Sequence, residues 1–452
     1  MIDLAQWLPR VVEANRRWMA QFGEFSPHAS LHVSDHEVEQ VFEQLQNRLT
    51  HNYPFGHPNY VGQMLKPPHP AAVLGYVSAM LINPNNHSLD GGPATAAMER
   101  EVISKFAAMF GFSAHLGHLT TSGTIANLEA LWVAREQRPG MRIAYSADAH
   151  YTHARMCRVL GVEGVAIETD GNGRMSLEAL ETELRSGTIG TVVVTLGTTG
   201  LGALDPLHLI VPLARQYGAR IHVDTAYGGF FTLIADDSSD GVAQAPYSAI
   251  ADVDSVVVDP HKHGLQPYGC GAVLFSDPAV GRHYLHDSPY TYFSSTDLHL
   301  GEISLECSRA GAAAAGLWMT LELIPLTNDG LGAVLRTNRR GALEWAELIE
   351  QSDAFDLYQQ PELDIVTYFP TARTLSDIDG MSAQLFKDAA ALPSSEQVHL
   401  ATYSAKAAGF AARGHSAEAD VAAARIMRST VMKPESAERI RSIHEKLVSL
   451  TS

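Results

Sequence analysis

VVVDPHKHGLQPYGCG, residues 256–271, is the stretch from which the fold can be worked out. Its valines form an apolar run that ends abruptly in Asp259, Pro260, His261 and Lys262. A strand that is apolar on both faces is typical of a parallel sheet covered by helices, and ligand sites of such sheets lie at the carboxyl ends of the strands. The stretch is therefore either an ordinary surface turn or a turn that presents Lys262 for chemistry.

The chain on both sides of this stretch alternates between strand and helix patterns. Apolar runs of strand length recur at residues 143–147, 164–170, 191–196, 221–223, 256–258 and 269–277. Amphipathic runs of helical period lie between several of them. This alternation predicts an α/β domain with a mainly parallel sheet.

The pattern changes towards both ends of the chain. Residues 1–55 are predicted to form an N-terminal helical segment, whose first helix carries an apolar stripe of Leu4, Trp7, Leu8, Val11 and Val12. Residues 56–324 are predicted to form the large α/β domain. Helices dominate residues 325–452, with short strands at 364–370 and 399–405, which predicts a small C-terminal α+β domain.

Composition restricts the class of protein. With 452 residues, 46% of them hydrophobic, the chain can bury a sizeable core. A formal net charge of −18 argues against a nucleic-acid partner. Three cysteines favour a reduced, cytoplasmic setting, and the N-terminus lacks the pattern of a signal peptide. No run approaches the roughly 18 apolar residues of a membrane span.

Polar residues gather where the expected strands end. The strands lead, in chain order, into His150, Thr199, Asp224 with Ala226, and Lys262. Upstream, a helix opens with Ser122, Gly123 and Thr124, and the free N–H groups of such a turn suit a phosphate. Taken alone, each residue has a plainer explanation as a cap, a core histidine or a solvated lysine. Their common position at one sheet edge favours a binding site.

Two other kinds of site fit the sequence less well. GTTGLGALD, residues 197–205, holds three glycines, but their order differs from that of a dinucleotide-binding turn. Histidine pairs three residues apart lack the cysteine or carboxylate partners of a tetrahedral metal site; they are His115/His118, His150/His153 and His283/His286. Apart from His150, these histidines are interpreted as structural or solvated, and no metal is expected.

Pyridoxal 5′-phosphate is the cofactor that uses these groups together. A lysine forms a Schiff base with its aldehyde, an acid pairs with its pyridine nitrogen, an aromatic side chain stacks on its ring, and a helix N-terminus holds its phosphate. Lys262, Asp224, His150 and the turn at Ser122 supply these four groups. The sequence therefore predicts a pyridoxal-phosphate enzyme, and a nicotinamide-binding or non-enzymatic α/β protein is the alternative.

The motifs also resemble those of the group II pyridoxal-phosphate-dependent amino-acid decarboxylases, which include the aromatic-L-amino-acid, tyrosine and glutamate decarboxylases. The matching segments follow the family's order, at residues 83–84, 92–99, 117–127, 148–150, 222–228, 259–262, 308–311 and 427–434. The resemblance implies the aspartate-aminotransferase-like fold (fold type I). It also implies decarboxylation of an L-amino acid to the amine and carbon dioxide.

The resemblance assigns roles residue by residue. Lys262 would be the Schiff-base lysine, Asp224 the partner of the pyridine nitrogen and His150 the stacking ring. Ala226 would pack on the opposite face and Thr199 beside the cofactor, while the phosphate would be held by Ser122, Gly123, Thr124 and His261. Family members are homodimers with shared active sites, so Ser308 is expected to reach the partner's phosphate. Tyr290 or Tyr292 is expected to protonate Cα, and the sequence does not decide between them.

The chain departs from the family pattern at several positions. His263 follows the lysine where tryptophan is common, and the phosphate turn reads Thr-Thr-Ser-Gly instead of Thr-Ser-Gly-Gly. Asn85 and His87 stand where aromatic-specific relatives carry apolar pocket residues, which indicates a polar substrate or another branch of the family. The substrate stays open. So do other reactions of the same cofactor, namely aldehyde-forming oxidative decarboxylation, carbon–carbon cleavage and transamination.

Overall fold

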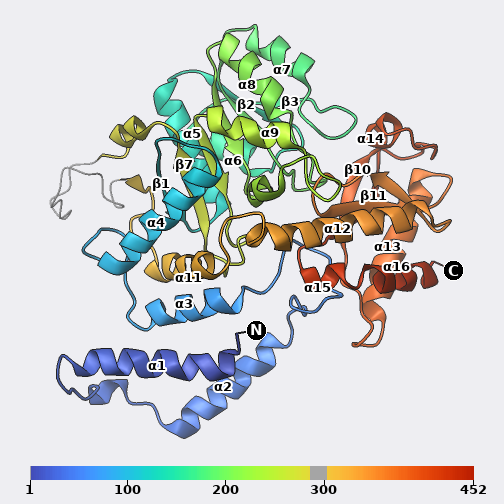
Figure 1. Ribbon diagram of the computed structural model, residues 1–452. Helices are drawn as coiled ribbons and strands as arrows, with labels where there is room; N and C mark the ends of the chain where they lie inside the picture. The colour runs from blue at the N-terminus through green and yellow to red at the C-terminus, as the bar shows by residue number, and fades with distance from the viewer. Residues whose placement is uncertain (1, 286–302, 452) are drawn as a thin grey trace.

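A seven-stranded sheet forms the centre of the large domain in the computed structural model, which describes residues 2–285 and 303–451 (Figure 1). The strand order is β1-β7-β6-β5-β4-β2-β3. The bounds are β1 Leu116–Thr120, β2 Arg142–Ser146, β3 Gly164–Ile167, β4 Ile189–Thr195, β5 Arg220–Asp224, β6 Ser255–Val258 and β7 Gly271–Phe275. Neighbours from β3 to β6 pair in parallel, and β7 is antiparallel to both β6 and β1. The predicted mainly parallel sheet is confirmed.

The sequence patterns did not reveal the edge strand β1. Its residues LGHLT contain glycine, histidine and threonine and therefore show no apolar run. The strand forms because β7 offers an unpaired edge, and a Cβ at Gly117 would lie only 2.6 Å from the Val273 carbonyl oxygen. Glycine permits this close pairing, and tertiary context overrides the weak local preference for a strand.

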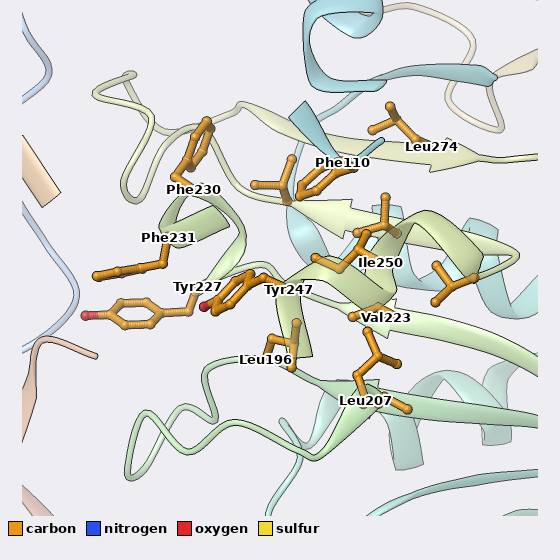
Figure 2. Close-up of a cluster of buried hydrophobic side chains, with 14 of the residues drawn as sticks. Phe110, Leu196, Leu207, Val223, Tyr227, Phe230, Phe231, Tyr247, Ile250 and Leu274 are labelled. Carbon is orange, nitrogen blue, oxygen red and sulfur yellow. The ribbon is translucent and has the colours of Figure 1, made fainter. Parts of the chain in front are cut away.

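Helices cover both faces of this sheet and connect its strands. They are α3 Pro70–Met80, α4 Pro93–Met109, α5 Gly123–Gln137, α6 Thr152–Leu160, α7 Leu177–Leu184, α8 Leu207–Gln216, α9 Gln244–Ser248 and α11 Gly311–Leu323. Gly111, at φ +79°, follows the end of α4 in the left-handed conformation that is common after helices. Figure 2 shows Leu196, Val223 and Leu274 of the sheet region packed among aromatic side chains of the covering segments. This core holds the strand ends in fixed positions.

A second, four-stranded antiparallel sheet forms the smaller C-terminal part, with the order β10-β11-β9-β8. Its strands are β8 Phe355–Gln359, β9 Ile365–Pro370, β10 Ala401–Lys406 and β11 Ala423–Thr430. The helices are α12 Leu331–Glu350, α13 Leu375–Ala391, α14 Ala407–Ala412, α15 Pro434–Ala437 and α16 Ile440–Ser449. The backbone leaves helical geometry at Arg439, with φ −110° and ψ 4°, and this separates α15 from α16.

Two helices, α1 Leu4–Ala20 and α2 Asp35–Leu49, form an N-terminal arm that lies beside α3 (Figure 1). A capping box between Ser34 and Glu37 opens α2. No residue of either helix is buried, and Trp7 and Trp18 are 41% and 45% exposed. Only part of the predicted apolar stripe is therefore covered. The limits 55/56 and 324/325 between the three parts stay a prediction.

Within the described residues, no helix combines the length and apolar character that a membrane span requires. In the same residues there is no group of three or more His, Cys, Asp or Glu side chains arranged to hold a metal ion.

Candidate active site

A cavity of about 230 Å³ lies at the carboxyl ends of β4, β5 and β6 and beside the start of α5. The structure brings most of the sequence-predicted site residues to this cavity: Ser122, Gly123, Thr124, His150, Thr199, Asp224, Ala226, His261 and Lys262. They converge because parallel strands end at the same sheet edge. The cavity contains a primary amine, which can form an imine with a carbonyl group, and a carboxylate beside it.

Lys262 stands on a tight turn after β6. Its Nζ lies 3.0 Å from Asp259 Oδ2, and its backbone N–H donates to the Asp259 carbonyl at 2.9 Å. A Cβ at Gly264 would lie 2.6 Å from Pro260 Cα, so the turn requires glycine at that position. The turn therefore delivers the amine from a rigid strand end into the cavity.

Asp224, the last residue of β5, is held by two donors. Its Oδ1 accepts the Ala226 backbone N–H at 3.0 Å, and its Oδ2 lies 2.8 Å from His153 Nε2. Burial opposes ionisation of this carboxyl group. The hydrogen bond and charge of His153, with the Ala226 amide and Lys262, outweigh burial and hold the Asp224 pKa well below its usual range. Asp224 is therefore an ionised carboxylate at neutral pH.

His153 is a residue whose importance the sequence did not reveal. Its spacing from His150 was considered only as part of a metal site, which the lack of further ligands argued against. The structure places it in α6, fully buried, with its ring stacked on Tyr145 at a centroid distance of 6.3 Å. The sequence did contain one indication of this residue: a histidine without an obvious partner, in the first turn of a helix beside the predicted site.

His150 lines the cavity near the start of α6. Its Nδ1 lies 2.6 Å from the Thr152 hydroxyl, and its ring packs against Tyr151. Burial lowers the pKa of His150; Asp224 opposes this shift and Lys262 adds to it. The ring is therefore neutral at pH 7 and can present an uncharged face to a bound aromatic ring.

Side-chain contacts fix the turn before α5. Ser122 caps α5 by accepting the Ile125 N–H at 3.3 Å, and a Cβ at Gly123 would lie 2.6 Å from Asp259 Oδ2. Asn127, which sequence reasoning missed, donates to the Gly123 carbonyl at 2.8 Å and is held by His222 at 2.9 Å. Burial lowers the pKa of His222 to about 3, so this support is uncharged.

A second cavity of about 390 Å³ adjoins the first and shares His150 and Thr199 with it. Arg428, from β11 of the small sheet, lines it together with Gln63. The Arg428 Nε donates to the Thr199 carbonyl at 2.9 Å, and its Nη2 is buried without a hydrogen-bond partner in the described part of the chain. A guanidinium with an unused donor is suited to a carboxylate.

Three predicted residues lie away from both cavities. Asn85 Nδ2 donates to Ser308 Oγ at 3.1 Å, and the His87 backbone N–H donates to Asn85 Oδ1 at 3.1 Å. They form a group of their own in this chain. Tyr290 and Tyr292, the predicted proton donors, lie outside the described residues.

These groups fit pyridoxal 5′-phosphate. The ionised Asp224 suits a protonated ring nitrogen, the Lys262 amine suits an aldehyde, and the N-terminus of α5 suits a phosphate. A side chain at Gly123 would collide with Asp259, so the start of this turn requires glycine.

Comparison with known proteins agrees with this chemistry. A model of the pyridoxal-dependent decarboxylase conserved domain matches residues 26–369. L-tyrosine decarboxylase of Enterococcus faecium is 27% identical, over 71% of this chain and 69% of the relative. Aspartate 1-decarboxylase of Aliivibrio fischeri is 29% identical, over 76% of this chain and 68% of the relative.

The fold agrees as well. The crystal structure of mouse CSAD superposes with a TM-score of 0.81 at 21% identity, covering 96% of this chain and 92% of that one. The chain thus has the predicted aspartate-aminotransferase-like fold of type I. It belongs to the pyridoxal-dependent decarboxylase family and is a pyridoxal 5′-phosphate-dependent carboxy-lyase that converts an amino acid to the corresponding amine.

Proposed function

We propose that Lys262 holds the cofactor covalently through Nζ and that Asp224 keeps the cofactor's ring nitrogen protonated. The observation that carries this proposal is the position of an ionised carboxylate and a primary amine at the ends of the neighbouring strands β5 and β6, around one cavity. When bound, the cofactor supplies an electrophilic carbonyl carbon and a ring that accepts the electron pair left by the departing carboxylate.

The remaining cavity residues position the reactants. The neutral His150 ring packs on one face of the bound ring and Ala226 on the other, with Thr199 at the side. Ser122, Gly123 and Thr124 donate to the phosphate at the start of α5. His261 lines the same cavity: its Nδ1 donates to the Cys270 carbonyl at 2.6 Å, and its Nε2 lies 3.5 Å from Asp259 Oδ2. It would donate to the phosphate through Nε2 only as an imidazolium, because a neutral ring protonated at Nδ1 has no second N–H.

Arg428 and Gln63 are proposed to hold a carboxylate of the substrate. The Arg428 Nη2 has the free donor, and the two contacts of Nε with the Thr199 and Gly200 carbonyls fix the guanidinium against the wall of the cavity. A bound carboxylate would then lie beside His150, at the junction of the two cavities. Arg428 and Gln63 would hold the carboxylate there, and the cofactor would supply the electron sink that loss of carbon dioxide requires.

The test is a panel of L-amino acids, including tyrosine and aspartate, incubated with the enzyme and added pyridoxal 5′-phosphate. We expect equal amounts of carbon dioxide and amine from at least one substrate. In Arg428→Gln, KM for that substrate should rise about tenfold or more, because a charge-assisted hydrogen bond is lost.

Arg425→Gln is the matched control. Arg425 lies on the same strand, is paired with Asp379 and points away from the cavities, so its KM should match the wild type. An aldehyde or a keto acid as the product would contradict the amine-forming reaction. An unchanged KM in Arg428→Gln would remove the proposed carboxylate site.

We also propose a homodimer in which the N-terminal arm packs on a second copy. The arm exposes many apolar side chains, and burying them against a second copy would be favourable. They are Trp7, Val12, Trp18, Val38, Val41, Phe42, Leu45 and Leu49. The group of Asn85, His87 and Ser308, which lies apart from this chain's cavities, would then contribute to the partner's site. Sedimentation should give the mass of two 48.9 kDa chains, and Phe42→Glu should shift it towards one. A single-chain mass for the wild type would contradict the dimer.

A cytoplasmic location belongs to the same proposal. Cys157, Cys270 and Cys307 are all free thiols, which is consistent with a reducing compartment. Fractionation of cells that express the protein would test it.

A further inference from the structure

The contact between His153 and Asp224 joins helix α6 to the end of strand β5. His153 is in the first turn of α6, which follows β2, and Asp224 ends β5. Nε2 and Oδ2 are 2.8 Å apart, and both side chains are buried, at 0% and 6% exposure. Asp224 lines the cavity, but His153 does not. The side chain of His153 is therefore linked to the cavity by its hydrogen bond to the Asp224 carboxylate.

The direction of the hydrogen bond follows from the chemistry of the pair. An ionised carboxylate only accepts, so His153 Nε2 must carry the hydrogen. In the described structure the other ring nitrogen, Nδ1, is buried without a partner. A buried nitrogen without a partner is unfavourable, and an aliphatic residue would avoid it. The bond to Asp224 is what a histidine contributes at this position.

The surroundings leave this bond as the main control on the carboxylate. Tyr145 of β2 stacks on the His153 ring, and His222 of β5, His150 and Lys262 are the other titratable groups near the pair. His222 is already engaged by Ser255 and Asn127. The Ala226 N–H fixes Oδ1, and His153 fixes Oδ2. Both oxygens are thus oriented, and their remaining lone pairs are available to the cavity.

We propose that His153 is a positioning residue that fixes the rotamer and the charge of Asp224, so that the carboxylate can hold a proton on the ring nitrogen of the cofactor. This inference rests on the proposed role of Asp224. It predicts that His153 matters only for a ligand whose ring contains that nitrogen.

The experiment compares binding of pyridoxal 5′-phosphate with binding of its 1-deaza analogue, in which a carbon replaces the ring nitrogen. Dissociation constants are measured for the wild type, His153→Leu and His153→Gln. In His153→Leu the constant for pyridoxal 5′-phosphate should rise about tenfold or more, as expected for loss of a charge-assisted hydrogen bond. The constant for the 1-deaza analogue should change by less than about twofold, so the preference for the nitrogen-containing ring is lost.

His153→Gln tests the hydrogen bond directly. Its amide nitrogen can donate from nearly the same place as Nε2, so most of the preference should return. His118→Leu is the matched control, because it removes another buried histidine–carboxylate pair, His118 with Glu129 at 2.9 Å, away from the cavity. It should leave the preference intact even if it lowers thermal stability.

The outcomes separate the two proposals. If the wild type binds both ligands equally, the role of Asp224 fails. If the wild type prefers pyridoxal 5′-phosphate and His153→Leu keeps that preference, the role of His153 fails. Should His153→Leu not fold, His153→Asn, whose amide is too short to reach Asp224, replaces it in the same comparison and must show the same loss.

Discussion

Lys262→Ala is expected to abolish the visible absorbance of the lysine-bound cofactor and to lower kcat by about 10⁴-fold or more. Among the described residues that line the cavity, Lys262 supplies the only primary amine. Without it the cofactor can be held only by its phosphate, its ring nitrogen and stacking. Absorbance spectra of the reconstituted variant and single-substrate turnover measure the two effects.

Lys262→Arg separates chemistry from folding. Arginine keeps a positive charge close to Asp259, the 3.0 Å partner of the lysine, but it has no amine that can attack the aldehyde. The variant should keep the thermal stability of the wild type and lose the same absorbance and activity as Lys262→Ala. Persistence of the absorbance in either variant would show that the cofactor is attached elsewhere.

Asp224→Asn is expected to lower kcat by about 10²- to 10³-fold, the range found when one group that stabilises developing charge is removed. The neutral amide cannot hold a proton on the ring nitrogen, so the ring accepts electrons less readily. It also lacks the charge interaction with His153, which in the wild type favours the ionised form of the Asp224 carboxyl group. The measurement is kcat at saturating substrate and cofactor, together with the cofactor dissociation constant.

Asp205→Asn is the control for replacing a buried carboxylate. Asp205 accepts the Thr195 and Met175 N–H groups, and burial raises its pKa to about 7. It lies near the end of β4 but not on the cavity. This variant is expected to change thermal stability and to keep kcat within a few-fold of the wild type. Equal losses of kcat in both variants would argue that Asp224 has only a structural role.

Local sequence patterns predicted the sheet because each strand is a short apolar run between amphipathic helices. They also indicated several residues that line the cavity, since side chains that follow parallel strands must meet at one edge. β1 was not predicted, because its glycine and histidine interrupt the apolar pattern of a strand. The strand forms by pairing with the free edge of β7. The division of the last helix at Arg439 also left no clear mark in the residue pattern.

By itself the sequence determined the α/β class, the order of the strand-end motifs and the choice of Lys262, Asp224, His150 and the turn at Ser122, which meet in the cavity. These features follow from periodicity along the chain and from the common direction of parallel strands. Only the tertiary structure decided that His153 binds Asp224 and that Arg428 reaches Thr199, because these partners are 71 and 229 residues apart. Such contacts depend on where α6 lies relative to the end of β5 and on how the small sheet meets the large one, which no local pattern encodes.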